Sequence, residues 1–196
     1  NPSSIYSFSD RNRKAIAEAR QKTAEVIGAS ADEIFFTSGG TEADNWALKG
    51  SAERNRTKGN RIITTRIEHH AVLHTAEYLA KNGFDVVFLD VDPEGRVRME
   101  DLKKAVNDRT ILVSVVFANN EIGTIQPVSA IGAFCRENGI LFHTDAVQAA
   151  AHTPIDVKAM NIDLLSMAAH KFYGPKGVGA LYIRKGVRID NFMHGG

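Results

Sequence analysis

Lys171 differs from the other members of the chain's 24 lysines and arginines because of its place in the sequence. It follows an apolar, strand-like segment, residues 164–167, and lies within a stretch rich in glycine and proline. A lysine held at a strand end, partly out of water and next to the basic His170, can act as an amine nucleophile that forms a Schiff base. A solvated surface lysine is the ordinary alternative, but the constrained backbone on either side of Lys171 favours the nucleophile.

Asp145 lies at the carboxyl end of another apolar segment, residues 140–144. Burying a carboxylate there is costly unless a partner compensates for its charge. A protonated ring nitrogen of a cofactor would be such a partner. Two alternatives remain open: Asp145 caps a short helix over residues 146–151, or it shares a metal ion with His143, which lies on the same strand face.

The loop Ser38-Gly39-Gly40-Thr41 joins a predicted strand, residues 34–37, to a predicted helix. The two glycines let the backbone approach a ligand closely, and the first N–H groups of a helix attract phosphate. The Thr41 hydroxyl can add a further donor. An ordinary capped turn explains the same residues equally well, because the loop matches neither of the two common glycine-rich nucleotide-binding patterns.

Three histidines, His69, His70 and His74, follow the predicted strand at residues 62–65. His70 and His74 have the i, i+4 spacing of a helical zinc pair. The glutamate of the H-E-x-x-H pattern is absent, however, and the single cysteine, Cys135, lies in a predicted amphipathic helix. We therefore predict no metal site. His69 is better placed to lie flat against a planar cofactor.

Together these loops contain the parts that a pyridoxal 5′-phosphate site requires, provided that they meet. Gly40 and Thr41 would cradle the phosphate. Asp145 would keep the pyridine nitrogen protonated, which makes the ring an electron sink, and Lys171 would form the Schiff base. His69 would stack on the ring.

The elements that must position these residues alternate along the chain. Seven strand-like segments, separated mostly by helices, are predicted at residues 34–37, 62–65, 86–89, 111–117, 140–144, 164–167 and 178–183. They predict an α/β fold with a seven-stranded, mostly parallel sheet and helices on both faces. The last segment follows the sixth too closely for a crossover helix, so we expect it to run antiparallel. Ligands in such sheets bind beyond the carboxyl ends of the strands.

The residues after the most apolar segment, residues 111–117, belong to the same predicted edge. Asn119-Asn120-Glu121-Ile122-Gly123 offers amide donors there, although a simple loop turn would explain it as well. Gln148, three residues after Asp145, adds another amide.

Composition limits the classes of function. The 196 residues carry a net charge of +1, so no basic excess is present to neutralise phosphates, and we predict no nucleic-acid or membrane partner. One cysteine excludes an internal disulfide and a multi-thiolate metal site. No apolar run approaches the roughly 20 residues of a membrane span. The chain begins at Asn1 without an initiator Met and stops at Gly196 without a closing element, so we expect both ends to be truncated.

These motifs resemble those of the cysteine desulfurases, a group of class V aminotransferases within the aspartate-aminotransferase-like (fold type I) pyridoxal-phosphate enzymes. The similarity is greatest to the group that supplies sulfur for iron–sulfur clusters. The matching segments span essentially the whole chain: residues 1–4, 37–45, 68–69, 119–123, 145–148, 170–177 and 193–196.

The resemblance implies catalytic roles for three residues. Lys171 is the lysine that holds the cofactor as an aldimine. Asp145 is the partner of the pyridine nitrogen. His69 stacks on the ring and assists proton transfer.

The resemblance also implies contacts to the rest of the cofactor. Asn120 and Gln148 hydrogen-bond the phenolic oxygen of the ring. Gly40, Thr41 and His170 hold the phosphate.

Two departures from the family's pattern stand out. The family often has a serine or threonine three residues before the lysine as another phosphate donor, and here that position is Ala168. Losing one hydroxyl contact to a charged group costs about 1.5–3 kcal/mol, so we expect weaker cofactor affinity. The family's nucleophilic cysteine lies on a mobile loop well beyond the segment that matches residues 193–196. We expect Cys135 to be a core residue instead.

The resemblance thus implies that residues 1–196 are the large cofactor-binding domain alone, without the small C-terminal domain. The full-length enzyme would convert L-cysteine to L-alanine and an enzyme persulfide, for iron–sulfur cluster or other thio-cofactor assembly. It would be a homodimer that donates sulfur to an acceptor protein, located in the cytoplasm or in an organelle of a eukaryote. The fragment by itself would lack turnover. A selenocysteine lyase or another class V enzyme, and a non-catalytic assembly or binding module, are the alternatives.

Overall fold

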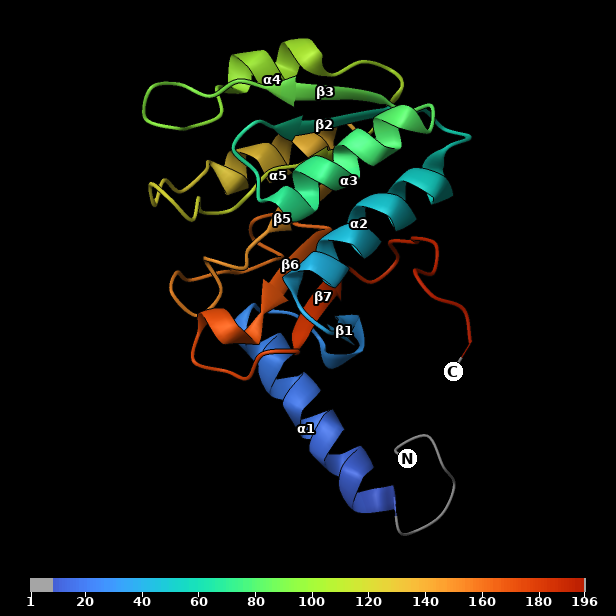
Figure 1. The fold of residues 1–196 in the computed structure, drawn as a ribbon, viewed down its shortest axis with the longest axis vertical. Coiled ribbons are helices and arrows are strands. Elements are labelled where there is room, and N and C mark those ends of the chain that lie inside the picture. The colour runs from blue at the N-terminus through green and yellow to red at the C-terminus, as the bar shows by residue number, and fades with distance from the viewer. Residues whose placement is uncertain (1–8, 196) are drawn as a thin grey trace.

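The computed structural model describes residues 9–195, which fold around one seven-stranded sheet (Figure 1). The strand order is β1-β7-β6-β5-β4-β2-β3. The matching segment at residues 1–4 and the final Gly196 lie outside the described residues. None of the helices in the described part is both long and apolar enough to cross a membrane.

All seven predicted strands are present, with small differences in their ends. They are β1 (Ile34–Thr37), β2 (Arg61–Thr65), β3 (Asp85–Leu89), β4 (Thr110–Ser114), β5 (Leu141–Asp145), β6 (Leu164–Ala168) and β7 (Gly179–Ile183). β7 pairs antiparallel with both β1 and β6, and the remaining pairs are parallel. The prediction of one antiparallel strand is therefore confirmed.

The longest apolar segment, residues 111–117, is only partly a strand. β4 ends at Ser114, although the N–H groups of Val115 and Phe117 still donate to the carbonyls of His143 and Asp145 at 3.1 and 2.8 Å. The carbonyl of Phe117 instead accepts from the N–H of Gln126, which closes a loop. The prediction of one continuous strand was wrong at its end, because the backbone turns here to build that loop.

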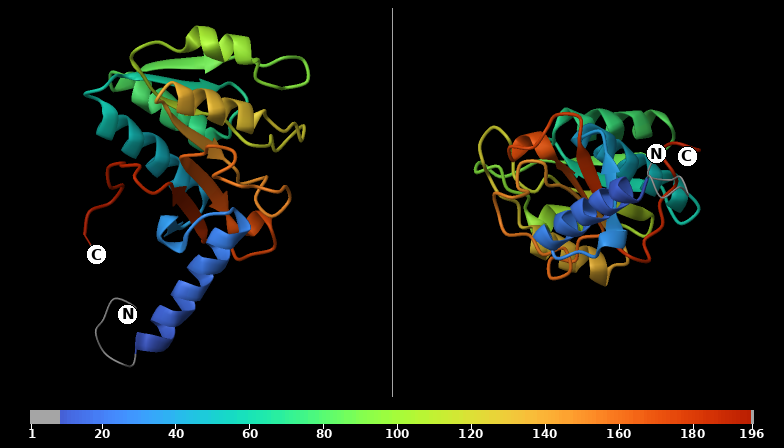
Figure 2. Two further views of the ribbon diagram at one scale, coloured as in Figure 1. Left: turned by 180° about the vertical axis from the view of Figure 1, so that it is seen from behind. Right: turned by 90° about the horizontal axis from the view of Figure 1, so that it is seen from below.

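Helices cover both faces of the sheet (Figure 2). One face carries α2 (Gly40–Asn55) and α3 (His70–Lys81), and the other carries α4 (Met99–Ala105), α5 (Val128–Glu137) and the end of α1 (Asp10–Val26). Most of α1 extends away from the sheet, and Ala24 is its buried residue (Figure 1). Residues 147–152 form turns, so the predicted alternative of a helix over 146–151 was wrong.

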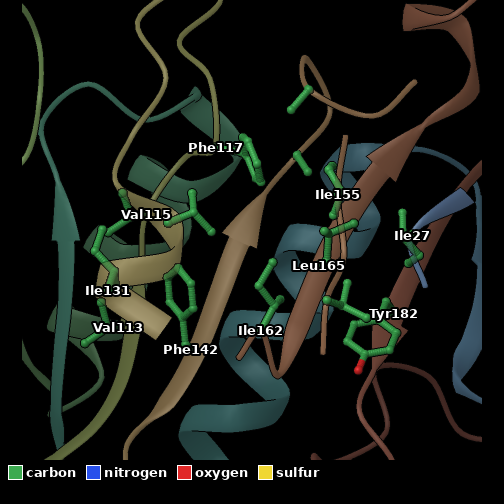
Figure 3. Packing of buried hydrophobic residues seen from close by; sticks show 14 of the residues in the cluster. Ile27, Val113, Val115, Phe117, Ile131, Phe142, Ile155, Ile162, Leu165 and Tyr182 are labelled. Carbon is green, nitrogen blue, oxygen red and sulfur yellow. The ribbon is translucent and has the colours of Figure 1, made fainter. Parts of the chain in front are cut away.

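Two apolar clusters hold these layers together. Figure 3 shows the larger one, in which Val113 and Phe142 of the sheet pack with Ile131 of α5. The smaller one joins Leu48 of α2 and Val72 of α3 to the opposite face. Each face of the central strands is thus buried, which explains why these strands are apolar throughout their length.

Gly132 in α5 allows this helix to lie directly against the turn at residues 157–161. A Cβ at this position would lie 2.0 Å from the carbonyl oxygen of Met160. The backbone contact leaves no space for even a methyl group.

We predict that Gly132→Ala destabilises the chain by about 1–3 kcal/mol, because the clash outweighs the roughly 1 kcal/mol that alanine adds to a helix. Urea unfolding curves of this chain measure the change. Ser129→Ala, at an exposed position of the same helix, should stay within about 0.5 kcal/mol of wild type. A stabilised Gly132→Ala variant would contradict the contact.

Candidate active site

A cavity of about 260 Å³ opens at the carboxyl ends of the parallel strands. Its walls come from the residues that follow β1, β2, β4, β5 and β6, and from the first turns of α2 and α3. All eight site residues predicted from the sequence line it: Gly40, Thr41, His69, Asn120, Asp145, Gln148, His170 and Lys171. Asp44, Val116, Ala118, Val147 and Ala168 complete the lining.

The start of α2 forms one wall. Gly39 precedes the helix, and among the described residues no side chain caps this helix start. A Cβ on Gly40 would lie 2.6 Å from Cγ2 of Val147, so the helix start can approach the turn after β5 only with glycine here. Free N–H groups at a helix start bind anions, and this wall therefore suits a phosphate.

His69 is the N-cap residue of α3. Its Nδ1 accepts a hydrogen bond from the N–H of Ala71 at 3.1 Å. In the neutral ring the proton is therefore on Nε2. The cap holds the imidazole at the cavity wall. The sequence predicts that this ring lies flat against a planar cofactor.

Asp145 lies at the end of β5 and is 4% exposed. Its Oδ1 accepts the N–H of Val147 at 2.9 Å, so it caps a turn and faces the cavity at once. Burial raises the pKa of Asp145, while the Val147 N–H and electrostatic interactions with His69 and Lys171 oppose that shift.

Lys171 and His170 lie on the short helix η3 (Ala169–Lys171) that follows β6. The backbone carbonyl of Lys171 is 2.9 Å from Nε2 of His152, which anchors this turn. Gly174 packs against Ala169, where a Cβ would lie 2.7 Å from Cβ of that residue. Lys171 and His170 are both exposed, so the expectation that Lys171 is partly out of water is wrong for the cavity as it stands open.

Asn119, not Asn120, organises the loop after β4. Its side chain donates to the carbonyl of Ile67 at 3.0 Å and accepts the N–H groups of Glu121 and Ile122 at 2.9 and 3.1 Å. This arrangement leaves Asn120 directed to the cavity wall. The amide of Gln148 lines the cavity from the turn after β5.

Two further carboxyls, Asp44 and Glu68, are buried beside Asp145, and sequence reasoning did not select either. Glu68 accepts the hydroxyl of Thr65 at 2.7 Å and the N–H of Val116 at 2.8 Å through Oε1, while Oε2 has no partner. Burial raises the pKa of Glu68 to about 8. One signal was available for Asp44: it lies one helical turn after Gly40 and therefore on the same face of the helix as the glycine.

His143 serves a structural network rather than a metal. It is fully buried between the hydroxyls of Ser114 and Ser166, at 2.8 and 3.0 Å from its two ring nitrogens. Burial lowers its pKa to about 3, so the ring is neutral. Within residues 9–195 no group of three metal-ligating side chains gathers, and the alternative of a metal shared by His143 and Asp145 finds no support.

Cys135 lies in α5 within the larger apolar cluster and is fully buried. Burial raises the pKa of its thiol to about 12. The expectation that Cys135 is a core residue is confirmed.

The whole chain, residues 1–196, matches the aminotransferase class-V family. The chain belongs to this family. A cysteine desulfurase IscS from Clostridium botulinum (strain Kyoto / Type A2) is 66% identical over all 196 residues, and one from Methanosarcina thermophila is 60% identical. This chain spans about half the length of these relatives, 49% and 48% respectively.

Solved structures agree with this family assignment. A structure described as SspA in complex with cysteine has a TM-score of 0.97 and 40% identity. The match covers all of this chain and 57% of the length of that structure's chain. A NifS-like protein has a TM-score of 0.97, 46% identity and 54% of its own chain covered. Members of this class V family depend on pyridoxal 5′-phosphate.

We predict that Glu68→Gln makes the folding stability of the chain less dependent on pH. The folded chain keeps the Glu68 proton up to a pH of about 8, whereas the ordinary pKa is 4.5. Wild type therefore loses stability as the pH rises between these values, by up to about 1.4 kcal/mol per pH unit for this group. Glutamine retains the accepting oxygen and is always neutral.

Thermal unfolding midpoints at several pH values test this. Near pH 4.5 the two proteins should agree, and at pH 8 the variant should unfold several degrees higher, since about 1 kcal/mol corresponds to 2–4 °C in a chain of this size. A variant that is less stable by the same amount at every pH would show that Glu68 acts only through its hydrogen bonds.

Proposed function

We propose that this chain is the cofactor-binding domain of a cysteine desulfurase, which converts L-cysteine to L-alanine and passes the sulfur to an enzyme thiol. The observation that carries the proposal is the convergence of Lys171, Asp145 and the open start of α2 on one cavity. The names of the close relatives, and a structural neighbour described in complex with cysteine, support the substrate.

The residues around the cavity fit pyridoxal 5′-phosphate. The contact between Gly40 and Val147 brings an uncapped helix start to the wall, as an anion requires. The Val147 N–H, His69 and Lys171 favour the charged form of Asp145, and a carboxylate is the partner that a protonated ring nitrogen requires. When bound, the cofactor supplies an aldehyde for an amine and a ring that withdraws electrons from the bonds next to that amine.

Three side chains would act on the substrate and the cofactor. The Nζ amine of Lys171 would attach the cofactor, and its exposure lets it move a proton to or from the substrate carbon. The carboxylate of Asp145 would hold the proton on the ring nitrogen. The imidazole of His69, fixed through Nδ1 by the N–H of Ala71, would pack on the ring and assist proton transfer at Nε2.

The remaining predicted residues would orient the cofactor. Gly40, Thr41 and His170 would hold the phosphate through backbone N–H groups, a hydroxyl and a cationic ring. The amides of Asn120 and Gln148 would hydrogen-bond the phenolic oxygen. Ala168, which lines the cavity, provides no hydroxyl, so the affinity for phosphate depends on the other donors.

Cys135 does not accept the sulfur in this proposal. It is the chain's single cysteine, it is buried in α5, and its pKa of about 12 keeps it a thiol at neutral pH. Only a thiolate attacks sulfur efficiently. The thiol that forms the persulfide therefore has to come from outside residues 1–196.

The proposal includes partners and a location. Two copies would form a homodimer, and exposed Ile122 and Tyr173 on loops that carry site residues support such a contact. A sulfur-acceptor protein would take the persulfide sulfur. A cytoplasmic location, or an organellar one in a eukaryote, rests on the family resemblance.

We predict that the chain mixed with pyridoxal 5′-phosphate gains a visible absorbance band that remains after the free cofactor is removed. Borohydride reduction should fix the label to Lys171, located by peptide mass spectrometry, because Nζ of Lys171 is the amine at the cavity. Lys171→Ala should lose both signals. Lys176→Ala, on the same loop but outside the cavity, should keep them, and a label elsewhere would contradict the site.

We also predict that Cys135 stays unmodified during incubation with pyridoxal 5′-phosphate and L-cysteine. Iodoacetamide should label Cys135 at least about 100-fold faster in the urea-unfolded chain than in the folded chain, because burial suppresses the thiolate. Mass spectrometry of the intact chain measures both reactions. A persulfide on Cys135 would overturn the assignment of this thiol to the core.

A further inference from the structure

Asp44 has an unsatisfied carboxyl oxygen beside the cavity. It lies in the second turn of α2, is 1% exposed, and its Oδ1 has no hydrogen-bond partner. The closest basic atom is Nε2 of His143 at 3.6 Å, which is too long for a hydrogen bond. A buried carboxylate with one oxygen unpartnered is disfavoured relative to the neutral acid, even where a hydroxyl such as that of Ser166 donates to the group.

The groups that face Asp44 also favour a proton on it. Asp145 from β5 and Glu68 from the segment after β2 are acids, and both raise the pKa of Asp44 beyond the larger effect of burial, while the Ser166 hydroxyl opposes the shift. His143 from β5 does not compensate, because its buried imidazole is neutral. Three anions in one buried cluster would repel one another without a matching number of cations.

Asp145 has the partners that Asp44 lacks. Its Oδ1 accepts the N–H of Val147, and electrostatic interactions with His69 and Lys171 lower its pKa. If these neighbouring carboxyls share one negative charge, the charge is therefore more stable on Asp145 than on Asp44.

We propose that Asp44 is a positioning residue that keeps its proton at neutral pH, so that the buried pair Asp44 and Asp145 carries a single negative charge, on Asp145. A second anion on α2 would compete for the ammonium of Lys171 and for a cationic ring nitrogen. The neutral acid leaves one carboxylate to direct both. The role in cofactor binding rests on the proposed function, whereas the place of the proton rests on the burial of Asp44 and on the groups around it.

Infrared spectra of the cofactor-free chain at pH 7 locate the proton, because protonated carboxyls and carboxylates have separate C=O stretching bands. Asp44→Asn should lose a protonated-carboxyl band, and Asp145→Asn should keep that band. Glu68→Gln identifies the band of the third acid. The proposal is overturned if Asp44→Asn keeps every protonated band or if Asp145→Asn removes the one assigned to Asp44.

The pH dependence of unfolding separates this role from simple packing. Because the folded chain binds the Asp44 proton more tightly than the unfolded chain, wild type loses stability as the pH rises. The unfolding midpoint of Asp44→Asn should therefore fall less steeply than that of wild type as the pH rises above 3.8, the ordinary pKa of the group. A parallel shift at every pH would mean that Asp44 only fills space, which contradicts the proposal. If the asparagine variant does not fold, Asp44→Ser takes its place in both measurements.

Titration with pyridoxal 5′-phosphate tests the consequence for the cofactor. The affinity lost in Asp145→Asn should exceed that lost in Asp44→Asn at least tenfold, since only the first removes the anion. Equal losses would overturn the positioning role. If wild type binds no pyridoxal 5′-phosphate, the proposed function fails, and the infrared bands still decide where the proton is.

Discussion

The burial of a carboxyl at the end of β5 is the constraint that the surrounding residues have to satisfy. Asp145 loses nearly all contact with water, and burial by itself favours its neutral form. One backbone N–H from Val147 and electrostatic interactions with His69 and Lys171 favour the charged form instead. These partners lie on three separate loops. The carboxyl can therefore hold a charge only while the sheet keeps those loops together.

The strand order explains how the loops meet. β5 lies between β4 and β6 in the middle of the sheet, so the residues after each of these strands surround Asp145. β7 runs antiparallel between β6 and β1, and it starts at the same edge where the others end. Gly179 at its start packs against Gly39, where a Cβ would lie 2.6 Å from Cα of Gly39. Close packing of two backbones thus brings the start of α2 to the cavity.

Local patterns predicted most of the fold because each pattern reflects burial along a single element. Central strands are covered on both faces, so they appear in the sequence as apolar runs of strand length. The same reasoning extended the strand before Asn119 three residues too far, since Val115 and Phe117 are buried in the larger apolar cluster although β4 ends at Ser114. It also expected Lys171 to be partly out of water. Exposure depends on which distant loops cover a residue, and no local pattern reports that.

The order of the elements and the chemical groups on their connecting loops were determined by the sequence itself: an amine at Lys171, a carboxyl at Asp145, and a glycine turn before α2. The tertiary structure alone decided which of these groups interact and how they are charged. Asp44 shows the difference, because none of its neighbours in the sequence determines whether its side chain is protonated. Its state follows from burial and from carboxyls more than twenty residues away in the sequence. Electrostatic free energies depend on distance in space and on access to water, and both arise only when the chain folds.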